Sequence, residues 1–153
     1  MNFFEQAVHE YLTQTLGLLT LPDMKVKRNE EGKSWSAQID FVALDFGTNR
    51  ILLVEVTANR DFPQWLVNKV TSLKDTQTIN WHVRTKVLKG EIQDSYRLAW
   101  LLVVPEKHVR ALRKETAAFP CEVIPLENVL QQLASGCSNE NAKQCGTLIA
   151  EAT

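Results

Sequence analysis

Two neighbouring segments decide the fold: Ser36–Asp45, with the sequence SAQIDFVALD, and Arg50–Thr57, with the sequence RILLVEVT. Both are typical of apolar β-strands, and each carries one acid within its hydrophobic run, Asp40 in the first and Glu55 in the second. An ionised carboxylate in such surroundings is costly unless its charge is compensated. Two such carboxylates on adjacent strands also repel each other. The pattern therefore predicts a cation between them or a proton that they share.

The chain reversal between these strands is predicted at residues 46–49, FGTN. Glycine as the first residue of a two-residue loop favours a type II′ hairpin turn. With Gly47 and Thr48 as the loop, Asp40 lies directly opposite Glu55. Opposed side chains have Cβ atoms about 4.5–5.5 Å apart, so both carboxylates could reach one metal ion. A loop placed one residue later makes the acids diagonal neighbours about 7–8 Å apart, from which they can still converge.

Length and composition predict one domain and exclude some functions. The chain has 153 residues, and we expect a single domain over residues 1–135 and a mobile C-terminal tail over 136–153. Hydrophobic residues make up 44% and charged residues 23%, which is ordinary for a globular protein. The net charge of −1 excludes an overall basic field, so nucleic-acid binding would need a local patch. The three cysteines form no CxxC pair, and we see no signal peptide and no uncharged run of about 18 residues. We therefore expect a cytoplasmic protein with no membrane contact.

Periodicity predicts the remaining elements around the hairpin. The strand–helix–strand stretch over residues 50–104 should form a right-handed parallel crossover. A mixed sheet with helices on both faces follows. The predicted elements are a helix at 2–16, a strand at 24–28, a turn at 30–33, a helix from 62 to about 74, an irregular segment at 80–94, a buried strand at 96–104, a helix at 105–118, a strand at 121–124 and a helix at 126–134.

The predicted order is a helix, a three-stranded meander, a helix and a strand, with Asp40 in the second strand and Glu55-Val56-Thr57 in the third. This arrangement resembles the PD-(D/E)XK nuclease superfamily over residues 1–104. The resemblance implies an α/β, restriction-endonuclease-like αβββαβ core with a mixed central sheet flanked by helices. It also implies that Asp40 and Glu55 bind Mg²⁺ or Mn²⁺, with help from the Val56 carbonyl. Glu5 on the first helix would assist, and the reaction would be phosphodiester hydrolysis in DNA rather than RNA.

The third motif residue departs from the family, because Thr57 stands where the family has lysine. Residues i and i+2 of a strand share a face, so Thr57 is predicted to point into the same site and could position a water. It cannot supply positive charge. Lys69 on the following helix is the best replacement, and Arg60 is a weaker one. Pro22-Asp23 also spells the opening letters of the motif, but we place it before the first strand and prefer Asp40. The predicted catalytic residues are Glu5, Asp40, Glu55, Thr57 and Lys69.

Basic residues after the hairpin are the candidates for nucleic-acid contacts: Lys69, Lys74, Arg84 and Lys86. Trp81 beside them could stack on a base. The alternative for the segment at 82–89 is an ordinary solvated loop. The size of the chain suits a homodimer or a subunit of a larger complex.

Three interpretations stay open at this point. The first is an active nuclease, and the second is a catalytically degenerate binding module of the same fold, favoured by Thr57 and the near-neutral charge. The third is an unrelated α/β domain whose two acids are neutralised by basic residues such as Lys27, Arg28 or Arg50. Glu5 has its own alternative, since an acid in a first helical turn complements the helix dipole.

Overall fold

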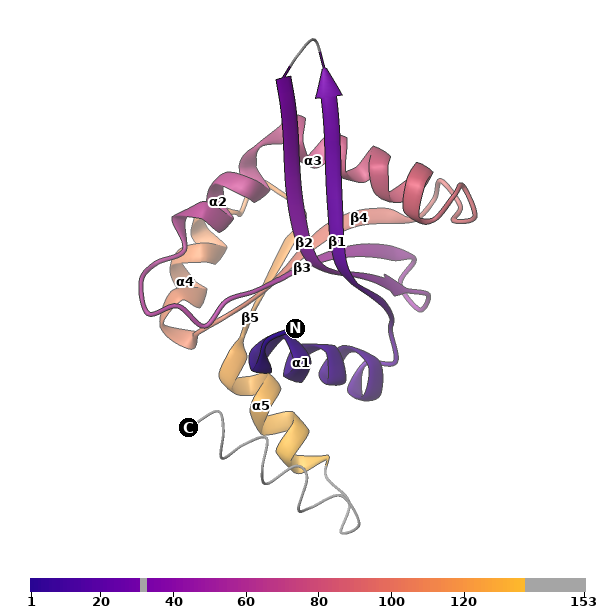
Figure 1. Cartoon of the computed structure of the whole chain (residues 1–153). Coiled ribbons are helices and arrows are strands. Elements are labelled where there is room, and N and C mark those ends of the chain that lie inside the picture. Colours follow the sequence, from indigo (N-terminus) through magenta and orange to yellow (C-terminus); the bar gives the residue numbers. More distant parts are fainter. Residues whose placement is uncertain (31–32, 137–153) are drawn as a thin grey trace.

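The computed structural model describes residues 1–30 and 33–136. It confirms an α/β protein built on a five-stranded mixed sheet with the strand order β1-β2-β3-β4-β5 (Figure 1). Strands β1, β2 and β3 form an antiparallel meander, and β3, β4 and β5 run parallel. The elements are α1 (Phe3–Glu10), the π-helical segment η1 (Tyr11–Thr15), β1 (Leu19–Glu30), β2 (Lys33–Asp45), β3 (Arg50–Val56), α2 (Gln64–Thr71), α3 (Leu73–His82), the π-helical segment η2 (Val83–Val87), β4 (Arg97–Val104), α4 (Glu106–Glu115), β5 (Cys121–Pro125) and α5 (Leu126–Ser135).

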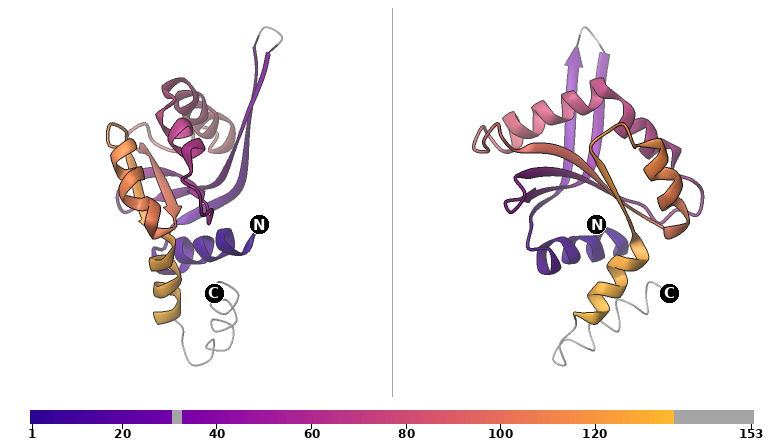
Figure 2. Two further views of the ribbon diagram at one scale, coloured as in Figure 1. Left: turned by 90° about the vertical axis from the view of Figure 1, so that its left-hand side faces the viewer. Right: turned by 180° about the vertical axis from the view of Figure 1, so that it is seen from behind.

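Helices cover both faces of the sheet, as Figure 2 shows. Apolar residues of α2, α3 and α4 pack on one face, among them Leu66, Ile79 and Leu112. Val8 of α1 and Val129 of α5 belong to the cluster on the other face. Alternate residues of β3 divide between the two clusters, as the period-2 geometry of a strand requires. Glu55 shares the face that carries α2 and α3.

The register predicted for the central hairpin is confirmed. Phe41 pairs with Val54 and Asp45 with Arg50, which is the alignment that places Asp40 across from Glu55. The predicted turn type is wrong, because the loop contains four residues, 46–49. The left-handed conformation falls on Asn49, with φ +54°, and not on the glycine. A four-residue loop centred at the same point gives the same register, so the error has no consequence for the acids.

The segment after β3 differs from prediction in two ways. The expected single helix is two helices, α2 and α3, that break at Ser72, whose hydroxyl accepts the Asp75 backbone N–H. The segment expected to be irregular, 80–94, is largely helical, since α3 and η2 continue to Val87. The hydrophobic periodicity of this segment is weak because α3 packs on the core mainly through Ile79, while neighbouring side chains such as Trp81 stay exposed. The parallel pairing of β3 and β4 is confirmed.

Strand β1 is longer than predicted and contains Pro22 and Asp23, which the sequence placed before it. The pairing of β1 with β2 runs from Pro22–Phe41 to Met24–Ile39 and omits Asp23 and Asp40, which would otherwise face each other. Asp23 has φ +54°, a conformation that Asp tolerates better than most residues. Both strands therefore change face at this point. The outer half of the hairpin leaves the sheet and rises above the molecule (Figures 1 and 2).

Two predictions fall on parts of the chain that are not described. The predicted tail, 136–153, lies outside the described residues except for Gly136, and the predicted turn at 30–33 includes the undescribed residues 31–32. Across the described ranges, no helix is long and apolar enough to span a bilayer.

Candidate functional site

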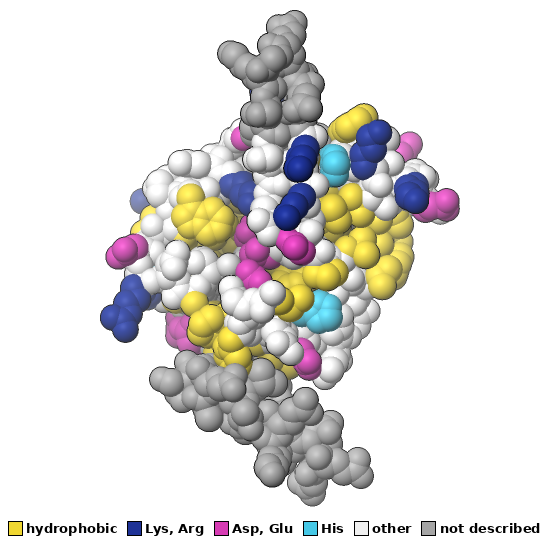
Figure 3. All heavy atoms as spheres, in the orientation of Figure 1, with side chains coloured by type: hydrophobic (Ala, Val, Ile, Leu, Met, Phe, Trp, Pro, Cys, Tyr) yellow, Lys and Arg dark blue, Asp and Glu magenta, His cyan; other side chains and the backbone are white. Residues whose placement is uncertain are grey.

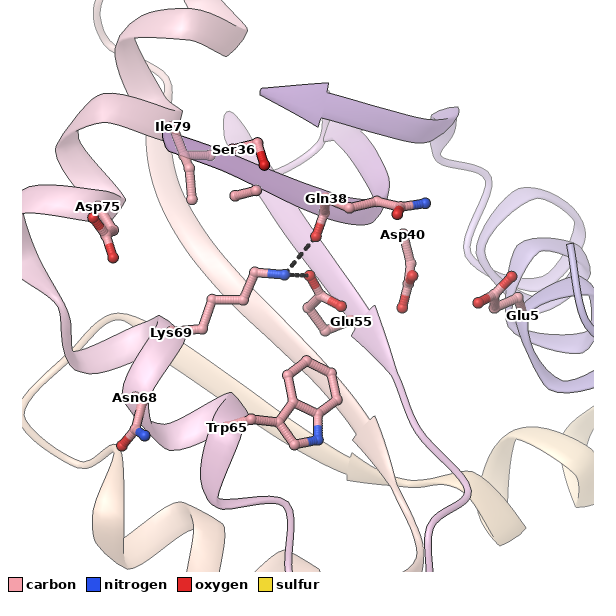
Figure 4. Close-up of a pocket in the computed structure, with 11 residues that line it drawn as sticks. Glu5, Ser36, Gln38, Asp40, Glu55, Trp65, Asn68, Lys69, Asp75 and Ile79 are labelled. Atoms are coloured by element: carbon pink, nitrogen blue, oxygen red, sulfur yellow. Dashed lines mark hydrogen bonds and ion pairs between the residues drawn. The ribbon is translucent and has the colours of Figure 1, made fainter. Parts of the chain in front are cut away.

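A cavity of about 640 Å³ opens where β2 separates from β3. Its walls come from the departing part of β2, from the end of β3 and from α2 and α3 (Figure 4). The lining residues are Glu5, Ser36, Ala37, Gln38, Asp40, Glu55, Trp65, Asn68, Lys69, Asp75 and Ile79. Four of the five predicted catalytic residues are in this set. The bend of the hairpin thus creates the space, and the predicted acids lie at its base.

Glu55 is the most deeply placed acid, with 2% of the residue exposed. Its carboxylate forms an ion pair with the ammonium of Lys69. Burial raises the pKa of Glu55 to about 8; the charge of Lys69 opposes this rise, while the negative charge of Asp40 and a hydrogen bond between the two acids add to it. The raised pKa favours the protonated form of Glu55 near neutral pH, and the Lys69 ammonium is a cation beside this carboxyl group.

Asp40 is half-buried at the point where the β2–β3 ladder ends. Its carboxylate accepts the backbone N–H of Val56 at 2.8 Å. A regular continuation of the ladder would give this N–H a backbone carbonyl of β2, and the bend takes that carbonyl away. Asp40 thus has a structural role in addition to its position beside Glu55. Its contact with Val56 is through the N–H group, whereas the family resemblance concerns the carbonyl.

Lys69 extends from α2 across the cavity, as the sequence anticipated for a lysine on the following helix (Figure 4). Besides the ion pair with Glu55, its ammonium donates to the backbone carbonyl of Gln38 on the departing strand. The same ammonium lies 5.8 Å from the ring centroid of Trp65, one helical turn earlier. Three partners therefore hold this charge beside Glu55 and away from bulk solvent.

Glu5 caps α1 and also lines the cavity. Its side chain accepts the Asn2 backbone N–H at 3.1 Å, while the Asn2 side chain accepts the Glu5 N–H at 2.9 Å, a capping box that starts α1. Glu5 also lines the cavity, and it lines an adjoining hollow of about 150 Å³ together with Asp23 and Asp40. Figure 4 shows its carboxylate facing Asp40 from the far side of the site.

Thr57 shares the face of Glu55, but its hydroxyl is engaged elsewhere. It accepts the backbone N–H of Asn59 at 3.2 Å, and its own N–H donates to Val103 of β4. Thr57 is 7% exposed and is not among the residues that line the cavity. Its observed contacts position the exit from β3.

The predicted nucleic-acid contacts occupy different environments. Lys74 is exposed on α3, and the Lys86 ammonium lies 5.7 Å from the ring centroid of Trp81. The Arg84 guanidinium is half-buried and donates to the Asn80 side chain and to the Tyr96 carbonyl. Arg84 therefore holds η2 against the start of β4, and it offers less to a phosphate than the two lysines do.

Arg50, one of the possible neutralising partners, lies away from the two acids. Arg50 forms ion pairs with Asp45 and Glu122 at the opposite end of β3. No group of three or more His, Cys, Asp or Glu residues within 1–30 and 33–136 is arranged to hold a metal ion. A metal at this site would depend on the carboxylates of Asp40 and Glu55, completed by water, backbone or substrate oxygens.

Sequence reasoning missed several lining residues, namely Gln38, Trp65, Asn68 and Asp75. The sequence does not identify Lys25 and Lys27, which are exposed on the outer part of β1, as nucleic-acid contacts, and it offers Lys27 only as a possible neutralising partner of the acids. Figure 3 shows basic side chains on the hairpin above a central group of acidic side chains. The spacing of Trp65 and Lys69, four residues apart, was the one available signal, since such residues lie on the same side of a helix.

Comparisons of the chain with protein-family models, with curated proteins and with solved structures find no match.

Proposed function

We propose that this protein is a divalent-metal-dependent phosphodiester hydrolase of the PD-(D/E)XK type that acts on DNA. The observation that carries the proposal is the convergence of Asp40, Glu55 and Lys69 on one cavity from β2, β3 and α2. The order of elements, a helix, a three-stranded meander, helices and a parallel strand, supports the restriction-endonuclease-like core that this superfamily shares.

The donor set fits a hard cation. Asp40 and Glu55 supply carboxylate oxygens on neighbouring strands, and their mutual repulsion would be relieved by a positive ion between them. Mg²⁺ binds through one or two carboxylates together with waters and substrate phosphate oxygens, so a third acidic ligand is not required. Such an ion would activate a water and stabilise the extra negative charge on the phosphoryl group.

The remaining chemistry belongs to the chain itself. Lys69 would bind a phosphate oxygen with the ammonium that now contacts Glu55. In this role Lys69 would replace the family lysine, whose position is occupied by Thr57. Glu5 faces Asp40 and would hold a water by hydrogen bonds. Lys25 and Lys27, exposed on the hairpin arm, would attract the backbone of a DNA strand toward the cavity.

A catalytically degenerate scaffold that binds nucleic acid is the second candidate. The observation in its favour is that Lys69 already compensates Glu55 and that the pKa of Glu55 is raised to about 8. A protonated Glu55 paired with a fixed lysine leaves little attraction for a metal at neutral pH. This candidate predicts salt-sensitive binding with no metal-dependent hydrolysis.

The test is thermal melting with and without Mn²⁺, followed by nuclease assays on plasmid, linear and single-stranded DNA. The variants are wild type, Asp40→Asn with Glu55→Gln, and a matched double variant outside the cavity, Asp45→Asn with Glu122→Gln. Metal at 100 times its Kd stabilises the folded state by about 2.7 kcal/mol. We expect this shift and DNA hydrolysis in wild type and in the matched control, and neither in the site variant. If Mn²⁺ does not raise the melting temperature of wild type and wild type does not hydrolyse DNA, the active-nuclease proposal is refuted and the degenerate scaffold remains.

A further inference from the structure

We propose that Trp65 is a stacking platform for an unpaired nucleobase, so that the substrate of this cavity is single-stranded DNA. The inference rests on the proposed function, since it identifies the form of DNA presented to the Asp40–Glu55–Lys69 site. It depends on the exposure of one aromatic ring, its place in the cavity wall and its contact with a fixed charge.

The first observation is the exposure of Trp65. It is the second residue of α2 and is 45% exposed, while the next two residues, Leu66 and Val67, are buried in the core. The ring lines the cavity and lies beside the acids (Figure 4). A large apolar ring exposed in a cavity wall is available to a planar ligand, because burying it would remove apolar area from water.

The second observation is the charge next to the ring. The Lys69 ammonium lies 5.8 Å from the Trp65 ring centroid and is itself paired with Glu55. A phosphate held by Lys69 would therefore place an adjacent base close to the indole face. Bases stack on aromatic rings in single strands whatever their sequence, because every base has a flat π-face. In a duplex those faces are covered by neighbouring base pairs, so the ring could meet one only after the base is unstacked.

The cavity volume agrees with this ligand. At about 640 Å³ it falls within the roughly 300–1,000 Å³ of sites that enclose small ligands. Asn68, exposed on α2, also lines the cavity and could hydrogen-bond a base edge. A cavity of this volume has room for one or two nucleotides.

Trp81 supplies a matched control within the same chain. It is 57% exposed, and the Lys86 ammonium lies 5.7 Å from its ring centroid. The two tryptophan–lysine pairs are therefore alike in ring exposure and in the distance from ammonium to ring. They differ in position, because Trp65 and not Trp81 lines the cavity that contains the acids.

The experiment measures binding of fluorescent single-stranded and duplex oligonucleotides in EDTA, which prevents hydrolysis. The variants are Trp65→Leu, which keeps an apolar cover over Lys69 but removes the ring, Trp65→Phe, which keeps a smaller ring, and Trp81→Leu. We expect Trp65→Leu to weaken single-strand binding roughly 5- to 150-fold, the range measured for one base–aromatic stack. Trp65→Phe should lose less affinity. Trp81→Leu should also lose less than Trp65→Leu, because Trp81 does not line the cavity that contains the acids.

Oligonucleotides with one abasic nucleotide at successive positions distinguish base stacking from a structural role of Trp65. An abasic nucleotide at one position should weaken wild-type binding by the same factor as Trp65→Leu, and it should have no further effect in that variant. Equal losses in Trp65→Leu and Trp81→Leu, or no sensitive abasic position, would overturn the inference while leaving hydrolysis intact. Stacking without Mn²⁺-dependent hydrolysis would uphold the inference and refute the catalytic proposal. Failure of wild type to bind single-stranded DNA in EDTA would overturn the inference, while the proposed hydrolysis is tested separately with Mn²⁺.

Discussion

The buried carboxylate of Glu55 on β3 is ion-paired with the ammonium of Lys69 on α2, fourteen residues further along the chain. Asp40, across the hairpin, contributes to the raised pKa of Glu55 by repulsion and by a hydrogen bond. These three side chains form one electrostatic unit. Changing any one of them should alter the protonation, stability and chemistry of the others.

Glu55→Gln should change how stability depends on pH. The pKa of Glu55 is raised from 4.5 to about 8 on folding, so between these values the folded state keeps a proton that the unfolded chain has lost. Wild-type stability should therefore fall as pH rises through this window, by at most about 1.4 kcal/mol per pH unit, and level off above it. Glu55→Gln lacks this slope. In urea denaturation, its free energy of unfolding relative to wild type should therefore rise from pH 5 to pH 8.

Asp45→Asn is the control for this pH series. The pKa of Asp45 is lowered by a hydrogen bond from Thr48 and by Arg50, so its contribution is present above pH 3.8 and is lost at more acidic pH. Its difference from wild type should stay constant between pH 5 and pH 9. Parallel stability curves for wild type and Glu55→Gln would contradict the assigned pKa.

Asp40→Asn should be more stable than Asp40→Ala. The amide oxygen of Asn can still accept the Val56 N–H, whereas Ala leaves this N–H without its partner where β2 departs. An unsatisfied buried donor costs about 1–3 kcal/mol. Both variants should lose metal-dependent hydrolysis. Chemical denaturation measures the first effect and a nuclease assay the second, and equal stability of the two variants would show that the hydrogen bond contributes nothing.

Lys69→Met should abolish most of the hydrolytic rate, while Lys74→Met should not. Lys69 is fixed against Glu55 and Gln38 inside the cavity, whereas Lys74 is exposed on α3. Removing a preorganised group that stabilises transition-state charge costs about 10²–10³ in kcat. Lys74→Met should alter DNA affinity and its salt dependence alone. Similar values of kcat for wild type and Lys69→Met would remove Lys69 from the mechanism.

Arg84→Ala should destabilise the fold and affect DNA binding little. Its guanidinium joins Asn80 and the Tyr96 carbonyl, so its loss leaves these acceptors unpaired at a cost of about 1–3 kcal/mol. Lys86→Ala, two residues away and exposed, should leave stability unchanged. The comparison requires melting curves and salt-dependent binding isotherms for both variants. If folded Arg84→Ala loses more DNA affinity than Lys86→Ala, Arg84 is a phosphate contact.

The sequence by itself determined the hairpin and the position of both acids, and it left two registers one residue apart. Period-2 patterning fixes which residues share a face, and a turn centred between Gly47 and Thr48 sets the register whether the loop has two residues or four. The acids at Asp40 and Glu55 were recognisable because a charge inside an apolar strand conflicts with its surroundings. Such local conflicts are visible without any knowledge of tertiary contacts.

Tertiary structure decided the rest of the site. The bend at Asp23 and Asp40 could not be predicted, because it arises where both strands change face together and β2 leaves β3. That departure opens the cavity, leaves the Val56 N–H to Asp40 and frees the Gln38 carbonyl for Lys69. The orientation of Thr57 toward Asn59 likewise depends on the path of the chain after β3. Sequence spacing fixes which residues neighbour one another along an element, but distances between elements follow from how the helices and the sheet pack.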